Sequence, residues 1–176
     1  MATVLTTTYD STSSSNAITI TLASLATSAT FVAGRESTVV DNTSNNFIDA
    51  IVSGQVTVGT SPTTAKQIVV YVYAPLKVAS GTFTYPLATT TALTASDAAA
   101  TFEIDQLNQL RFAAAANVIA TSDRAYSFAP FSVAALFGGV LPLKWGLYVA
   151  HNTAVNLNAT AGNHWFHYTG IKYTST

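Results

Sequence analysis

Residues 67–74 of the chain read Gln-Ile-Val-Val-Tyr-Val-Tyr-Ala. The run carries no charge, and its β-branched and aromatic residues are enriched in strands, where successive side chains point to opposite faces of a sheet. One face of the predicted strand holds Ile68, Val70 and Val72, and the other holds Val69, Tyr71 and Tyr73. Because both faces are apolar or aromatic, the strand lies either at the centre of a sandwich or against a neighbouring subunit.

Strand-like runs continue on both sides of this segment. Apolar and polar residues alternate over 17–22, and turn-forming residues at 41–46 and 59–65 separate the runs. Residues 109–120 could form an alanine-rich helix, but the β pattern around them favours a strand. The other strands are predicted at 47–58, where Gly54 marks a bulge or a close approach, and at 144–151 and 164–173.

Short strands separated by turns, with little helix, predict an all-β protein: an antiparallel β-sandwich that is jelly-roll-like. We expect 144–151 and 164–173 to pair as a C-terminal hairpin around the loop 156–163. Residues 17–176 would form this single domain. Residues 1–16 are rich in Thr and Ser and offer little to bury, so we expect them to form a flexible, extended N-terminal arm.

The charge content of the chain is low. Only 9% of its 176 residues are charged and 49% are hydrophobic, whereas roughly 25% charged residues is ordinary for a soluble domain. A surface made of Thr, Ser, Ala and Asn can be buried against a partner at little desolvation cost. The composition therefore favours assembly, and we expect a closed homo-oligomer, most simply a trimer. A low-charge soluble β domain is the alternative.

Other bulk features bear on the class of protein. The net charge is −1 and the seven basic residues are scattered, so we expect no nucleic-acid partner. The chain has no cysteine and therefore no disulfide or thiolate metal site. The N-terminus lacks the regions of a signal peptide, and the longest apolar stretch, 128–143, is interrupted by Pro and Gly. We expect no membrane partner, and synthesis in a cytoplasm.

Few residues suggest chemistry. His164 and His167 are three apart and point to opposite faces of a strand, so they cannot bind one metal ion together, and His151 has no carboxylate near it in sequence. Glu103 and Asp105 would share a strand face, but this spacing is common and typical of a solvated edge. The sequence has no glycine-rich phosphate loop, nucleophile elbow or zinc signature. We expect no enzyme activity, catalytic residue, cofactor or metal.

Aromatic residues concentrate in the expected C-terminal hairpin. They could anchor an interface or stack on sugars, although aromatic residues are also frequent in the cores of sheets. Together with the 67–74 strand they give the candidate interface, which consists of Ile68, Val70, Val72, Tyr71, Tyr73, Trp145, Trp165 and Tyr168.

Three stretches carry a family resemblance. They are residues 35–43, Arg-Glu-Ser-Thr-Val-Val-Asp-Asn-Thr; residues 144–149, Lys-Trp-Gly-Leu-Tyr-Val; and the ending that runs from Gly162-Asn163-His164 to Gly170-Ile171. These stretches resemble small structural proteins of tailed bacteriophages, the capsid decoration (cement) and minor capsid proteins.

The resemblance implies a jelly-roll-like domain on the virion surface, often a homotrimer, which braces the lattice of the major capsid protein. It implies no catalytic residue. The runner-up function is a phage tail or fibre module that binds host carbohydrate through the aromatic hairpin.

Overall fold

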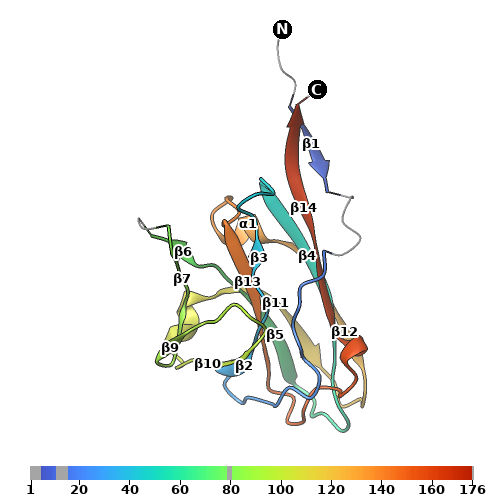
Figure 1. Cartoon of the computed structure of the whole chain (residues 1–176). Coiled ribbons are helices and arrows are strands. Elements are labelled where there is room, and N and C mark those ends of the chain that lie inside the picture. The colour runs from blue at the N-terminus through green and yellow to red at the C-terminus, as the bar shows by residue number, and fades with distance from the viewer. Residues whose placement is uncertain (1–4, 11–15, 79–80, 176) are drawn as a thin grey trace.

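Strands account for most of the protein (Figure 1). The structure is a computed structural model that describes residues 5–10, 16–78 and 81–175. Within these ranges helix is limited to one turn of α-helix, α1 (Val133–Leu136), and two 3-10 turns, Gln106–Gln109 and Ala161–Asn163. The predicted all-β class is confirmed.

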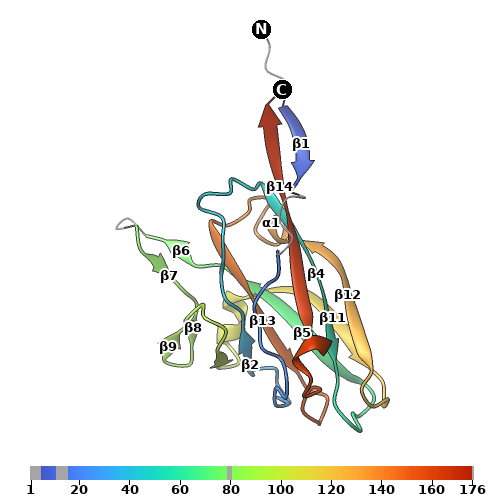
Figure 2. The ribbon, with the colours of Figure 1, turned by 45° about the vertical axis from the view of Figure 1, so that its right-hand side comes forward.

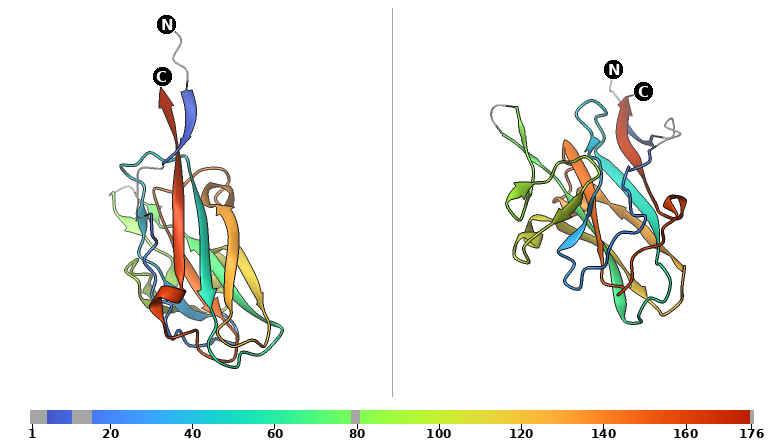
Figure 3. Two further views of the ribbon diagram at one scale, coloured as in Figure 1. Left: turned by 90° about the vertical axis from the view of Figure 1, so that its right-hand side faces the viewer. Right: turned by 60° about the horizontal axis from the view of Figure 1, so that its bottom comes forward.

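The strands form two antiparallel sheets that face each other (Figures 1 and 3). The smaller sheet has the order β1 (Leu5–Tyr9), β14 (Trp165–Ser175), β4 (Asp49–Thr57) and β12 (Ala125–Ser132). The larger sheet has the order β10 (Ala99–Thr101), β2 (Ala33–Glu36), β13 (Lys144–His151), β5 (Lys66–Tyr73) and β11 (Arg111–Val118), with β3 (Val40–Asp41) also beside β13. The strands predicted at 47–58, 67–74, 109–120, 144–151 and 164–173 are β4, β5, β11, β13 and β14.

The strands of the domain pair from its two ends inward. An isolated bridge between Ala17 and His167 sets the start of the domain beside β14. Next, β2 and β3 pair with β13, β4 pairs with β12, and β5 pairs with β11. The ladders between β14 and β4 and between β13 and β5 join these pairs into two sheets. The chain is therefore a long antiparallel ladder wound into two facing layers.

The predicted strand at 17–22 is only partly formed. Its alternation is present, because Ile18 and Leu22 are buried whereas Thr19 and Thr21 are exposed. The backbone N–H of Ile18 donates to the carbonyl of Phe166, but no longer ladder follows.

The main core lies between the two sheets. Its buried side chains come from both sheets, so each sheet shields the apolar inner face of the other from water. They include Val52 and Val56 of β4, Val70 and Val72 of β5, Leu147 and Val149 of β13, and Phe166 of β14. Each such side chain contributes about 1.5–3 kcal/mol through removal from water.

A second core lies on the outer face of the larger sheet. Residues 74–78 and 81–110 form the short pairs β6 (Leu76–Lys77) with β7 (Phe83–Thr84) and β8 (Leu87–Ala88) with β9 (Thr91–Ala92), and return through β10 (Figure 1). We call residues 74–78 and 81–110 the cover. The buried side chains of this second core are Leu93, Phe102 and Leu110 of the cover with Val69, Tyr73, Tyr148 and Ala150 of the sheet.

A narrow ribbon extends the smaller sheet beyond the body of the domain (Figure 2). β1 pairs with the end of β14, from Leu5 opposite Ser175 to Tyr9 opposite Ile171. β4 accompanies β14 only up to Ile171, so beyond that residue β1 is the only strand that the described chain places beside β14. We call residues 5–9 and 171–175 the terminal ribbon. Of the predicted arm, residues 1–4 and 11–15 lie outside the described residues, so its flexibility stays a prediction.

The predicted C-terminal hairpin is wrong. β13 belongs to the larger sheet and β14 to the smaller one, and residues 152–164 carry the chain between them. The crossing lets Trp145 and Leu147 line the core from one side while Phe166 lines it from the other. Two strands paired within one sheet could not face each other across a core in this way.

Gly54 is a point of close approach, as its position in the strand pattern predicted. A Cβ atom on Gly54 would lie 2.2 Å from Cδ1 of Phe166, which is opposite it on β14. Phe166 in turn stacks on Phe128, with ring centroids 5.8 Å apart. The missing side chain therefore makes room for an aromatic pair in the core.

We predict that Gly54→Ala lowers the free energy of unfolding by about 1–3 kcal/mol, the usual effect of overpacking a core. Gly162→Ala is the matched control, because nothing lies within 4 Å of its Cβ position. Urea denaturation would measure both. In a Phe166→Ala background the Gly54 substitution should lose most of its effect, and equal effects in the two backgrounds would contradict the steric explanation.

Candidate functional site

The predicted interface residues of β5 lie inside the chain. Ile68, Val70 and Val72 belong to the main core between the sheets, and Tyr73 is buried under the cover. Tyr71 is partly buried at the edge of the same cover. A partner could not touch the four buried residues without opening the sheet. Of the two positions that the sequence left open for this strand, it occupies the central one.

The predicted aromatic residues are divided between the two sheets. Trp145 of β13 is fully buried and makes an edge-to-face contact with Tyr168 of β14, with ring centroids 5.5 Å apart. Only Trp165, at the start of β14, is substantially exposed, with 38% of its surface open to solvent. The single aromatic platform expected from a hairpin is therefore absent, and Trp165 is what remains of it at the surface.

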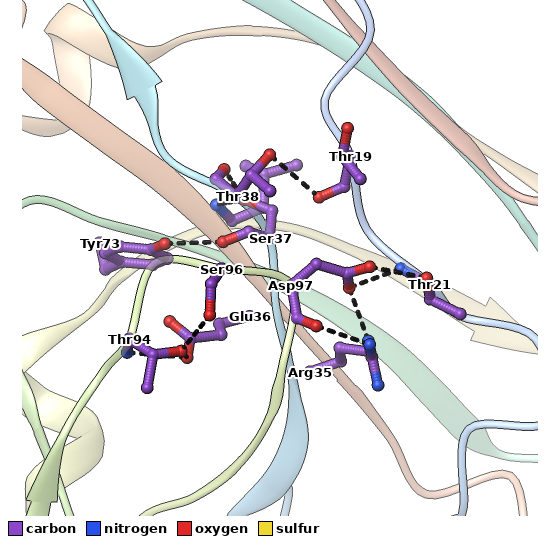
Figure 4. Close-up of polar contacts among 11 residues, drawn as sticks. Thr19, Thr21, Arg35, Glu36, Ser37, Thr38, Tyr73, Thr94, Ser96 and Asp97 are labelled. Carbon is purple, nitrogen blue, oxygen red and sulfur yellow. Dashed lines mark hydrogen bonds and ion pairs between the residues drawn. The ribbon is translucent and has the colours of Figure 1, made fainter.

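Charged residues in the 35–43 stretch hold the cover in place (Figure 4). Glu36 is buried, and its carboxylate accepts hydrogen bonds from the backbone N–H of Thr94 at 2.9 Å, the Thr94 hydroxyl at 2.6 Å and the backbone N–H of Ala95 at 2.9 Å. These three donors compensate a charge that would otherwise be costly to bury. Glu36 thus fixes the cover to β2, a role that its position in the sequence does not indicate.

Arg35 holds the next part of the cover. Its Nε lies 2.6 Å from Oδ1 of Asp97, and the Asp97 carboxylate also accepts from the backbone N–H and the hydroxyl of Thr21 (Figure 4). Desolvation works to raise the pKa of Asp97, but the hydrogen bonds from Arg35 and Thr21 outweigh it and hold the pKa below its ordinary value. Asp97 therefore links the cover to β2 and to the chain before it.

Two of the three histidines are structural. His151 is fully buried, with Nε2 3.0 Å from the carbonyl of Leu25 and Nδ1 2.9 Å from the hydroxyl of Thr153. Because Nε2 faces a carbonyl, it carries the proton of the neutral ring and donates to Leu25, while the Thr153 hydroxyl beside Nδ1 donates to the carbonyl of Val155. A hydroxyl beside an imidazole is the pairing of a nucleophile and its base, but here neither side chain is open to a substrate.

His164 is also buried. Its Nε2 lies 2.9 Å from the carbonyl of Asn158, and its Nδ1 accepts the backbone N–H of Thr57. It therefore ties the loop before β14 to the end of β4. His167 lies on the exposed face of β14, where its ring contacts that of Trp165.

The acidic residues are dispersed. Glu103 and Asp105 are exposed in an irregular segment, not on a strand, and Asp41 pairs with Lys144 at 2.9 Å. In the parts of the chain that the structure describes, no group of three His, Asp or Glu residues could hold a metal ion. None of the helices in those parts has the length and apolar character needed to cross a membrane.

Exposed apolar side chains gather at the end of the molecule that carries the terminal ribbon. The ribbon exposes Leu5, Tyr9 and Tyr173. Beside α1 there is a groove of about 390 Å³, which we call the end groove, lined by Ala74, Pro75, Leu76, Lys77, Phe83, Phe137, Pro142 and Leu143. Leu76 of this groove is 72% exposed and Leu143 is 45% exposed. Solvent-exposed apolar surface of this extent is a feature of interaction sites.

Comparisons of the chain with protein-family models, with curated proteins and with solved structures give no match. The family expected from the sequence stretches quoted above therefore stays a prediction.

The buried histidines make stability depend on pH. Desolvation lowers the pKa of His151 and of His164 below the ordinary value of 6.5, although hydrogen bonds to the carbonyls of Leu25 and Asn158 oppose it. In the unfolded chain the two histidines bind protons as the pH falls through about 6.5, whereas in the folded protein they bind protons only at lower pH. The stabilising effect is thus complete above that pH and is lost as the pH falls toward the folded-state values.

We predict that the free energy of unfolding falls between pH 7.5 and 5, by up to about 1.4 kcal/mol per pH unit for each histidine. Urea denaturation at several pH values measures this slope. His151→Gln should reduce it, whereas Tyr173→Phe, a change at an exposed group that does not titrate in this range, serves as the control. Asp41 does not contribute in this range: chiefly through the Thr43 hydroxyl, hydrogen bonds hold its pKa at about 2. A slope unaffected by His151→Gln would contradict the assignment.

Proposed function

We propose that the protein is a virion structural protein that decorates and stabilises a phage capsid, and that its domain is a jelly roll. The order of strand pairing supports the fold assignment, because a jelly roll is an antiparallel ladder of eight strands wound into two sheets. Jelly rolls occur in viral capsid proteins, but also in lectins and cupins, so the fold alone does not assign the function.

The terminal ribbon is the observation that carries the functional proposal. A two-stranded antiparallel pair is at best marginally stable in water by itself. This pair extends past β4, and Leu5, Tyr9 and Tyr173 expose their apolar surface there. A ribbon of this kind gains stability when another protein covers it, and its outer edge offers backbone groups to which a further strand can be added.

The ribbon also has the composition that the proposal needs. Its side chains are almost all Thr, Tyr or aliphatic, with Lys172 as the only charged residue among 5–9 and 171–175. Such a surface can be buried against a partner without leaving many charged groups unpaired in the interface. We propose that the ribbon docks on the major capsid protein and that the body of the domain stands on the capsid surface.

Deleting residues 2–10 tests this docking. We expect the melting temperature to stay within a few degrees, because β1 buries little, and attachment to capsids assembled without this protein to weaken at least tenfold. Co-sedimentation with those capsids measures attachment. Tyr9→Asp should weaken it as well, whereas Ile104→Asp, at a 70% exposed site on the cover, is the matched control.

Two outcomes would contradict the docking proposal. Failure of the shortened chain to fold would make β1 part of the folding core. Unchanged attachment would move the docking surface elsewhere. Electron microscopy that located the chain on the tail instead of the head would contradict the capsid assignment itself.

We also propose that the chain forms a closed homo-oligomer, most simply a trimer. The low charge of the chain supports this, as do the exposed Leu76 and Leu143 of the end groove. Since the strand first considered for the subunit contact is buried within its own domain, the end groove becomes the proposed contact.

Sedimentation equilibrium at micromolar concentration should give three times the 18.4 kDa mass of one chain. Leu143→Asp should shift the equilibrium toward the monomer, because it places a charge in the apolar contact, and Ile104→Asp should not. A wild-type monomer would end the trimer proposal, and an unaffected Leu143→Asp trimer would exclude the end groove as its contact.

A further inference from the structure

The outer face of the smaller sheet holds an exposed tryptophan among polar side chains (the sheet faces the viewer in Figure 3, left). Trp165 begins β14 and lies opposite Gln55 of β4, and His167 lies opposite Ser53. Residues two apart on a strand share a face, so all four side chains point outward. The rings of Trp165 and His167 are tilted by 58°, with centroids 5.4 Å apart.

Within the residues that the structure describes, the hydrogen-bonding side chains around Trp165 have no hydrogen-bond partner. The side chains of Gln55, His167 and Ser53 make no hydrogen bond to any residue of the described ranges. A glutamine amide both donates and accepts, as does a neutral imidazole, and a serine hydroxyl can do either. The tryptophan is therefore flanked by groups that are free to bind a ligand with several hydroxyls.

The outward positions of β14 and β4 next to Trp165 carry no charge. None of the outward positions of β14 from 165 to 171, or of β4 from 51 to 55, holds Asp, Glu, Lys or Arg. Asp49, farther along β4, has its carboxylate occupied by the Ser132 hydroxyl and the Ala134 N–H. A nucleic acid would require cations for its phosphates, and an anionic ligand would require a basic partner.

We propose that this face binds a neutral sugar, with one pyranose ring stacked on the indole of Trp165. The apolar C–H face of the sugar would lie on the indole, and Gln55 and His167 would hydrogen-bond hydroxyls at its rim. One aromatic anchor with a few placed polar groups is the usual composition of a small-ligand site. Because the site is a flat platform and not a pocket, we expect a dissociation constant on the order of millimolar.

The indole N–H signals of the full-length protein in a ¹H–¹⁵N spectrum would test the site. The probes are neutral disaccharides and trisaccharides of glucose, galactose and N-acetylglucosamine, at up to 20 mM. At least one should shift the Trp165 signal and leave that of Trp145, which is buried in the core, in place. Trp165→Ala should abolish saturation transfer to that sugar, and Gln55→Ala should weaken binding severalfold. Tyr173→Ala, an exposed aromatic residue on the ribbon, is the matched control.

Several outcomes would overturn the proposal. They are the absence of a shift with every neutral sugar, binding that survives Trp165→Ala, or a preference for anionic sugars. If Trp165→Ala instead abolishes self-association, the face belongs to a second copy of the chain. Capsid attachment of the Trp165→Ala variant should be normal, so the sugar site and the docking proposal succeed or fail separately.

Discussion

The burial of β5 and β13 on both faces is the constraint on which the rest of the structure depends. One face of each strand meets the smaller sheet, and the other would expose Val69, Tyr73 and Tyr148 to water if nothing lay over it. The cover removes that apolar surface, although it contains only short strand pairs of its own. Besides its packing in the second core and the pairing of β10 with β2, it is held by the Glu36 carboxylate under Thr94 and Ala95 and by the Arg35–Asp97 pair. Charged residues of the 35–43 stretch thus stabilise the inside of the domain.

Local patterns predicted the strands well and their partners poorly. β4, β5, β11, β13 and β14 follow from alternation and β-branched composition, and Gly54 was recognisable as a close approach. The partner of a strand is set by long-range packing, which alternation does not encode. Residues 144–151 and 164–173 therefore looked like a hairpin, although they lie in different sheets. The strand β12 was missed because Pro130 and the apolar residues after it conceal its alternation.

The same limit applies to the candidate sites. Trp145 and Trp165 both stand at or near the start of a strand, yet one is fully buried and the other is exposed, because they fall on opposite faces of their sheets. The apolar second face of β5 could be explained by a cover as well as by a subunit. No sequence pattern predicted that the cover packs on the sheet, since this segment is rich in turn-forming residues and threonine. The pairing of Trp165 with Gln55 and His167 required the register between β14 and β4.

The geometry of the terminal ribbon has a mechanical consequence. Leu5 and Ser175 are paired at its tip, and the hydrogen bonds of an antiparallel ladder run perpendicular to its strands. A force that pulls these two ends apart therefore loads the bonds one pair at a time, and the ribbon unzips easily. A force transmitted along a strand, such as one applied by a partner attached to the ribbon edge, loads all the pairs together in shear. The ribbon therefore resists a force along its strands better than a force that separates its two ends.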